Sequence, residues 1–124
     1  MAGLIWTMQL VHYPSLDGAS PSAFELNVRR TRLLVAPVMM VELAAAVLLA
    51  AAPPFGRGAE ALIGLGLLIL VWASTVFVQY PLHRRLAAAW DMNDYARLRR
   101  TNWARVAIWT VRGFIALDLL RGPL

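Results

Sequence analysis

The sequence predicts an all-α integral membrane protein: a four-helix bundle forming a single transmembrane domain over residues 1–124. Three observations lead to this fold class. Hydrophobic residues make up 60% of the chain and charged residues only 15%, outside the balance of a soluble domain. Four apolar segments, approximately 2–13, 33–52, 61–80 and 102–120, are separated by polar or turn-forming stretches. The motif Arg-Arg-Thr precedes the second and fourth segments, at 29–31 and 99–101.

The first apolar segment is short for a membrane span. Residues 2–13 give roughly 20 Å of helix, whereas a full span needs about 30 Å. They carry no basic n-region and no small-residue cleavage site, so they do not read as a signal peptide. Three explanations remain open: a start placed too late, a short span in a thinned region, or a partner that covers its end. We favour a short but real first span.

The first connector and the second segment follow. In residues 14–28, Ser22 and Glu25 fit a capping box for a short interfacial helix over 23–30. The second segment, 33–52, contains Pro37, which neighbouring helices can accommodate in a membrane. Residues 53–58, Pro-Pro-Phe-Gly-Arg-Gly, predict a tight turn.

The third segment is expected to form an antiparallel hairpin with the second. Gly64 and Gly66 would allow close approach to the Ala-rich end of that segment. The second connector, residues 81–101, predicts two short helical pieces on the membrane surface, with Asp91 or Asn93 capping the second piece. The fourth segment, 102–120, is expected to stop at Gly122 and Pro123.

The distribution of arginine predicts the orientation, because positively charged loops stay in the cytoplasm. All twelve basic residues are arginine, and most flank the two connectors: Arg29, Arg30, Arg32, Arg84, Arg85, Arg97, Arg99, Arg100 and Arg105. The opposite side carries only Arg57 and Arg121. Both termini should therefore lie outside the cytoplasm, with the arginine clusters against anionic lipid headgroups. In a chain this apolar, membrane lipids are the expected partners and nucleic acid is not.

The two halves of the chain align on short motifs. Tyr13-Pro14 matches Tyr80-Pro81, and each half then reaches its Arg-Arg-Thr, which suggests two span-connector-span pseudo-repeats; chance resemblance is the alternative. Glu42 lies thirteen residues after Arg29, and Arg112 lies thirteen after Arg99. An isolated charge at the centre of a bilayer costs about 3 kcal/mol. We therefore expect an intramembrane ion pair, either fixing helix register or serving an anion or a proton.

Helical spacing extends this pair into a polar cleft from the cytoplasmic edge down to Glu42 and Arg112. Its expected lining is Gln9, His12, Tyr13, Thr75, Gln79, His83, Asn102 and Arg105. His12 or His83 could ligate haem, and a quinone could occupy the cleft, but interfacial hydrogen bonding is the simpler role for two separated histidines. No metal site and no cofactor is predicted. Trp6, Trp72 and Trp109 are expected to fill the core.

Several short stretches resemble known membrane proteins: residues 79–86 (Gln-Tyr-Pro-Leu-His-Arg-Arg-Leu), Trp90-Asp91, 101–105 (Thr-Asn-Trp-Ala-Arg) and 109–112 (Trp-Thr-Val-Arg). They look like small bacterial four-span proteins of unknown function and, more distantly, the anthrone-oxygenase-like family. That family carries a Pro followed two positions later by Asn, then a span with Trp, His and Arg. Here Pro81 matches, His83 replaces the Asn, Trp103 and Arg112 correspond to Trp and Arg, and the His between them is missing.

Two functions are expected from these features. The small size and the lack of a catalytic signature favour an accessory or structural subunit of a larger membrane complex, or a homo-oligomer. The resemblance implies the alternative, a membrane-embedded oxidoreductase or oxygenase-like enzyme acting on an amphiphilic aromatic or quinone-like molecule in the cytoplasmic-side cleft. It also implies the bacterial inner membrane as the location.

Overall fold

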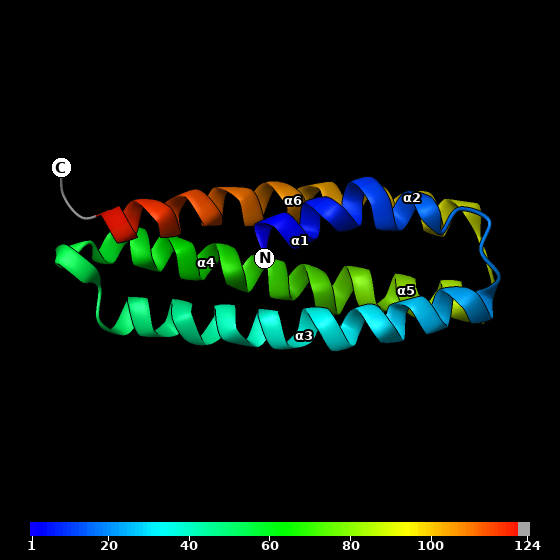
Figure 1. Cartoon of the computed structure of the whole chain (residues 1–124), viewed down its shortest axis with the longest axis horizontal. Helices are drawn as coiled ribbons and strands as arrows, with labels where there is room; N and C mark the ends of the chain where they lie inside the picture. The colour runs from blue at the N-terminus through cyan, green and yellow to red at the C-terminus, as the bar shows by residue number, and fades with distance from the viewer. Residues whose placement is uncertain (122–124) are drawn as a thin grey trace.

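The computed structural model describes residues 1–121, so the expected helix stop at Gly122 and Pro123 lies outside the described range. This part of the chain is all-helical, with four helices side by side (Figure 1). The first is α1 (Ala2–Thr7), a π-helical segment (Met8–His12) and α2 (Tyr13–Ser15); the second is α3 (Pro21–Ala51); the third is α4 (Gly58–Ser74), a π-helical segment (Thr75–Gln79) and α5 (Tyr80–Ala88); the fourth is α6 (Met92–Arg121).

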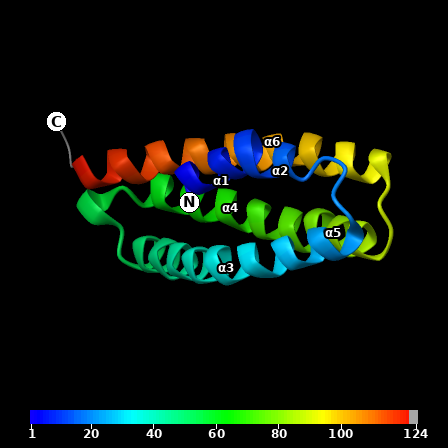
Figure 2. The same cartoon turned by 45° about the vertical axis from the view of Figure 1, so that its right-hand side comes forward.

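The two connectors between helices lie at one end of the bundle, and the turn between α3 and α4 lies at the other (Figure 2). The first helix, residues 2–15, packs against α6; α6 packs against α4, and α4 and α5 pack against α3. Because the first helix is about half as long as the others, Met1 lies near the middle of the bundle (Figure 1). Two helices, Pro21–Ala51 and Gly58–Ala88, are long and apolar enough to cross a membrane.

The two π-helical segments stand at matching positions, each directly before a Tyr-Pro pair. The backbone N–H of Tyr13 bonds to the Met8 carbonyl, and that of Tyr80 bonds to the Thr75 carbonyl, one residue further back than in an α-helix. Pro14 and Pro81 have no N–H to donate, so the preceding turn widens to redistribute its remaining hydrogen bonds. Both π-helical segments lie in the connector half of the bundle.

The expected interfacial helix over residues 23–30 is wrong, because α3 runs without a break from Pro21 to Ala51. No Gly or Pro separates residue 22 from residue 36, and arginine favours helix, so nothing ends the helix at the connector. The expected capping box of Ser22 and Glu25 is also wrong. Ser20 caps the helix by accepting the Ala23 N–H over 3.3 Å, and Pro21 occupies the first helical position.

The second connector does not form two separate surface helices either. Residues 80–88 continue the third helix, and residues from Met92 onward begin α6, so that only residues 89–91 leave the helical path. The proline at position 81 widens the helix instead of ending it. The predicted cap at Asp91 is confirmed, since its Oδ1 accepts the Asp94 N–H over 2.9 Å.

The tight turn after α3 is confirmed. Phe55 and Gly56 adopt left-handed conformations, with φ of 54° and 72°, and Arg57 ties the turn to α6. The Arg57 side chain pairs with Glu60 and with Asp118, which together raise its pKa.

The helices α3 and α4 form the expected antiparallel hairpin, but not through Gly64 and Gly66. A Cβ on Gly64 would meet Ile115 of α6 at 3.8 Å, and Gly66 faces open space. The two residues are separated by about 200° around a helix, so they cannot share one packing face. The interface between α3 and α4 is therefore made by other side chains.

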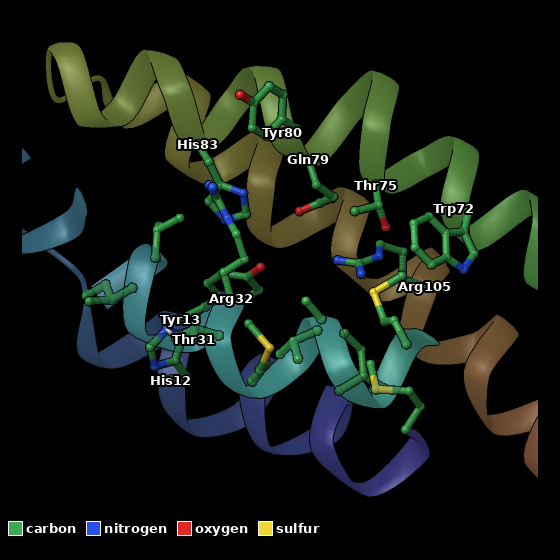
Figure 3. A pocket seen from close by; sticks show the side chains of 18 of the residues that line it. His12, Tyr13, Thr31, Arg32, Trp72, Thr75, Gln79, Tyr80, His83 and Arg105 are labelled. Carbon is green, nitrogen blue, oxygen red and sulfur yellow. Dashed lines mark hydrogen bonds between the residues drawn. The ribbon is translucent and has the colours of Figure 1, made fainter. Parts of the chain in front are cut away.

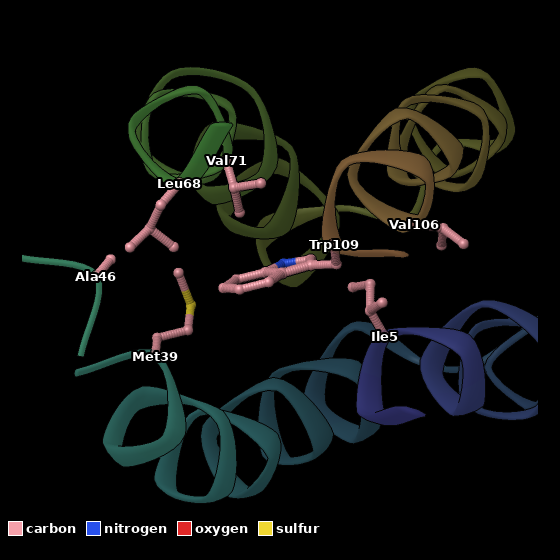
Figure 4. Close-up of a cluster of buried hydrophobic side chains, with 7 residues drawn as sticks. All are labelled: Ile5, Met39, Ala46, Leu68, Val71, Val106 and Trp109. Atoms are coloured by element: carbon pink, nitrogen blue, oxygen red, sulfur yellow. The ribbon is translucent and has the colours of Figure 1, made fainter. Parts of the chain in front are cut away.

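Buried apolar side chains form two clusters along the bundle. The central cluster surrounds Trp109 and contains Ile5, Met39, Ala46, Leu68, Val71 and Val106 (Figure 4). The second lies at the connector end and contains Tyr13, Leu16, Phe24, Leu82, Leu86, Tyr95 and Leu98. Trp109 thus fills the core as predicted and Trp72 packs against it. Trp6 does not: it is 38% exposed, because its indole bonds Thr110 on the outer side of the bundle.

Candidate functional site

A cavity of about 260 Å³ lies between the first helix, α3 and the third helix, in the connector half of the bundle (Figure 3). Its apolar wall comes mainly from α3, through Phe24, Val28, Val35, Ala36, Met39 and Met40, with Trp72 opposite. The exposed members of the lining, Arg32, Met40 and Tyr80 among them, mark its mouth. An apolar cavity of about 150 Å³ holds a benzene ring, so this one has room for a larger group.

One wall of the cavity carries the polar stripe predicted along the third helix. Thr75, Gln79 and His83 all line it. Thr75 Oγ1 donates back to the Val71 carbonyl over 2.8 Å, a bond internal to the helix. Gln79 is 1% exposed; its Nε2 donates to Thr101 Oγ1 over 3.0 Å, whereas its Oε1 is buried without a hydrogen-bond partner in the described part of the chain.

The first helix contributes His12 and Tyr13 to the opposite wall. His12 Nε2 lies 3.4 Å from Thr31 Oγ1 of α3. The Tyr13 ring stacks on the His83 ring with centroids 6.4 Å apart, and Phe24 packs against the same imidazole. Although Tyr13 is 1% exposed, its hydroxyl has no hydrogen-bond partner within residues 1–121.

Arg105 reaches the cavity from α6, as Figure 3 shows. Its side chain is 5% exposed, and its Nη1 donates to Asn102 Oδ1 over 3.1 Å while Nε has no partner among the described residues. Asn102 in turn donates to Gln9 Oε1 over 2.9 Å, and Gln9 Nε2 donates to the Arg99 carbonyl over 3.3 Å. These hydrogen bonds connect the guanidinium of Arg105, through two side-chain amides, to the backbone of α6.

Six of the eight predicted cleft residues therefore line the cavity, and two do not. His12, Tyr13, Thr75, Gln79, His83 and Arg105 are on its surface. Gln9 and Asn102 are buried between the first helix and α6, where they bond each other and leave no side-chain face toward the cavity. Helical spacing placed them on the right helices, but the rotation of the first helix against α6 turned them into the interface.

The cavity has a strongly one-sided charge. Arg32 and Arg105 line it, and no Asp or Glu does within the described residues. At the mouth, the guanidinium of Arg32 lies 5.8 Å from the centre of the Tyr80 ring, and that of Arg84 lies 6.0 Å from the same ring. These cation–π contacts hold Arg32 and one further positive charge, Arg84, beside the opening.

Glu42 and Arg112 are brought into contact, as expected from their equal distance to the Arg-Arg-Thr motifs. Arg112 donates through Nη1 to Glu42 Oε2 and through Nη2 to the Glu42 carbonyl over 3.2 Å. The Met1 amino group donates to the other carboxylate oxygen over 3.3 Å. The expectation that the cleft reaches this pair is wrong, because Met1, Met39 and Trp72 close the cavity before it.

Several residues of the site carried no recognisable signal in the sequence. The apolar lining from α3 looks like any other lipid-facing stretch, and Arg32 looks like a member of a surface cluster. Tyr95 was also missed: its hydroxyl, whose pKa is raised by burial, donates to the Tyr13 carbonyl over 2.6 Å and anchors the cavity-forming end of the first helix to α6. In the sequence Tyr95 stands between Asp94 and Ala96, and nothing there distinguishes it as an anchor.

The described residues contain no group of three or more His, Cys, Asp or Glu side chains placed to share a metal ion. His12 and His83 both line the cavity, and the expectation of haem or quinone there stays a prediction. The fold and the site together define a class: a four-helix protein with a cavity between its helices that is apolar in body and cationic at its polar wall. No protein-family model, curated protein or solved structure matches this chain.

Proposed function

We propose that this chain is a four-span membrane protein that binds an amphiphilic molecule, with an apolar body and a polar head, in the cavity of its connector half. The observation that carries the proposal is that four residues of the cavity lining, Tyr13, Trp72, Gln79 and Arg105, each hold a buried side-chain atom without a hydrogen-bond partner in the described part of the chain. Buried polar groups in native structures are nearly always hydrogen-bonded, so such groups indicate a missing ligand or water. Tyr13, Gln79 and Arg105 are each at least 95% buried, which makes leaving their polar atoms unpaired costly.

The proposal that the protein spans a membrane is supported by the distribution of its side chains, which is the reverse of that in a soluble protein. The buried polar residues are Gln9, Gln79, Asn102, Arg105 and Arg112, whereas large apolar side chains such as Leu33 (75%), Phe77 (78%) and Leu120 (77%) are exposed. Polar groups in a membrane protein face the bundle interior, and apolar groups face lipid. The 31 residues of α3 give roughly 46 Å of helix, more than the hydrocarbon core of about 30 Å.

The positions of the arginines support the proposed orientation. Both connectors lie at one end of the bundle (Figure 1), and the arginines of α3 and α5 stand in the parts of these helices next to the connectors, at 29, 30, 32, 84 and 85. With positively charged loops in the cytoplasm, the cavity opens in the cytoplasmic half and the turn between α3 and α4 faces outward. The matching π-helical segments before Tyr13-Pro14 and Tyr80-Pro81 support the proposal that the two halves are pseudo-repeats.

A matched pair of variants tests binding in the cavity. Val35 lines the cavity, and Leu34 is its neighbour on the exposed side of α3. With the protein in nanodiscs, we expect 2-methyl-1,4-naphthoquinone to raise the melting temperature of the wild type and of Leu34→Phe, and not of Val35→Phe, because the larger ring fills the cavity. Equal shifts in both variants would refute binding in this cavity.

The oxidoreductase or oxygenase chemistry implied by the family resemblance would use this same cavity. It remains a further proposal, and binding does not depend on it.

A second function, that of an accessory subunit, is favoured by a different observation. A hollow of about 20 Å³ between α3, α4 and α6 is lined by four small residues, Ala46, Ala61, Gly64 and Ala116, together with larger side chains such as Leu49 and Leu65. Small residues permit close packing of membrane helices, so a side chain from a helix of another subunit would fit there. Gentle solubilisation from the native membrane should then yield a complex; a lone 13.7 kDa chain would contradict this role.

A further inference from the structure

We infer that the molecule bound in the cavity is an apolar carboxylic acid, and that Arg105 holds its carboxylate with Tyr13 as a second donor. The inference rests on the proposed binding function and specifies its substrate class. Three features of the cavity lead to it: its uncompensated charge, the free edge of one guanidinium, and the donor that lies beside it.

The charge of the lining requires an anion. Arg105 is 5% exposed and pairs only with the neutral Asn102 amide. Within residues 1–121, the cavity wall has no carboxylate that could neutralise it, and the nearby acid Glu42 is already bound by Arg112. A buried charge without an opposite charge is unfavourable, so an anionic ligand would be stabilised at this position.

The geometry of the guanidinium selects a carboxylate. Nη1 is occupied by Asn102, and Nε makes no hydrogen bond in the described structure, which leaves the edge formed by Nε and Nη2 free. Two parallel N–H groups on this edge match the two oxygens of a carboxylate. Asn102 is itself bonded to Gln9, and Gln9 to the Arg99 carbonyl, so the guanidinium is anchored through Nη1.

Tyr13 completes the site from the opposite wall. Tyr13 lines the cavity, and its buried hydroxyl has no acceptor among the described residues. A phenolic O–H is a strong donor to a carboxylate oxygen, which would satisfy it. The remaining wall is formed by Val35, Met39, Met40 and Trp72 and offers only apolar contacts and one indole, which suits a hydrocarbon body. A cavity of about 260 Å³ fits a bicyclic aromatic acid if one of about 150 Å³ holds benzene.

The test compares 2-naphthoate with 2-naphthamide, a neutral molecule of nearly the same shape, by calorimetric titration of the protein in phosphatidylcholine nanodiscs, with empty nanodiscs subtracted. We expect the dissociation constant of naphthoate to be about 10- to 100-fold lower than that of naphthamide, the range for hydrogen bonds to a charged group. Arg105→Gln should remove this preference. Arg100→Gln, an exposed arginine of the same helix, should retain it.

Tyr13→Phe is a second variant, included because Arg105→Gln could lose binding simply by failing to fold. Because the Tyr13 hydroxyl bonds nothing in the protein, its removal should leave the melting temperature of the free protein unchanged and weaken naphthoate about 5- to 10-fold, with naphthamide unaffected. Repeating the titration with phosphatidylglycerol in the nanodisc tests a second source of the anion. Loss of naphthoate binding there would assign the site to a lipid phosphate and overturn the inference.

The outcomes separate the inference from the function on which it rests. If naphthamide and 2-methyl-1,4-naphthoquinone bind as tightly as naphthoate, and Arg105→Gln changes none of the three affinities, the inference of a carboxylic acid is wrong. Binding of an amphiphile in the cavity would still hold. If none of the three raises the melting temperature or binds in the titration, the proposed function fails together with the inference.

Discussion

Arg112 of α6 holds Glu42 of α3 at two points, the carboxylate and the backbone carbonyl oxygen. The two residues are seventy positions apart and lie on helices that are separated by α4 along most of their length. The contact joins α3 to α6 at the level of Met1, where the first helix begins. It therefore links the two helices at the boundary between the part of the bundle with four helices and the part with three.

Removing either charge should destabilise the bundle, and Glu42→Gln should do so more than Arg112→Gln. The Arg112 side chain is 8% exposed and that of Glu42 is 27% exposed, so the arginine is the costlier charge to leave unpaired. Breaking a buried pair costs about 3–5 kcal/mol, and the double variant should lose clearly less than the sum of the singles. Thermal unfolding in detergent of the four proteins measures this. Strictly additive losses would mean that the two charges are not coupled.

Tyr95→Phe should loosen the first helix. The Tyr95 hydroxyl makes a buried hydrogen bond of 2.6 Å to the Tyr13 carbonyl, and its loss should cost about 1 kcal/mol. Hydrogen exchange of the backbone amides in residues 2–15 should rise along with the fall in melting temperature. Tyr80→Phe is the control, because the Tyr80 side chain is 47% exposed. Equal effects of the two substitutions would show that the bond contributes nothing specific.

Two glycines should respond to alanine in opposite directions. Gly66 lies in α4 and faces open space, so Gly66→Ala should stabilise the helix by about 0.5–1 kcal/mol. Gly56 has φ of 72° in the turn, where a side chain costs about 1–2 kcal/mol. Gly56→Ala should therefore destabilise the protein in the same unfolding assay. A destabilising Gly66→Ala would instead point to a helix of another molecule packed on that face.

Single-cysteine variants can establish the topology, because the natural sequence contains no cysteine. Ala59 is exposed near the turn between α3 and α4, and Ala88 is exposed at the connector end. In intact cells, a membrane-impermeant maleimide should label Ala59→Cys, whereas Ala88→Cys should react only after permeabilisation. The reverse pattern would invert the proposed orientation. Labelling of both in intact cells would contradict a span between them.

Local pattern was enough to predict the helical class, the tight turn and the Asp91 cap, because each depends on residues close together in the chain. It also placed Thr75, Gln79 and His83 on one face, since residues four apart stay aligned on a helix. It did not predict that α3 and α6 continue through the connectors. Arginine-rich stretches are polar enough to suggest breaks in the helices, but arginine is a good helix former and does not interrupt them.

By itself, the sequence determined four helices and two opposite charges at matching distances from a repeated motif. The tertiary structure decided which polar residues meet one another and which face a cavity. Gln9 and Tyr13 lie one helical turn apart, yet Gln9 bonds Asn102 inside an interface and Tyr13 lines the cavity. The widened turn between them and the Tyr95 anchor set the rotation of the first helix, and such rotation depends on contacts between residues about eighty positions apart. Periodicity along a single helix carries no information about those contacts.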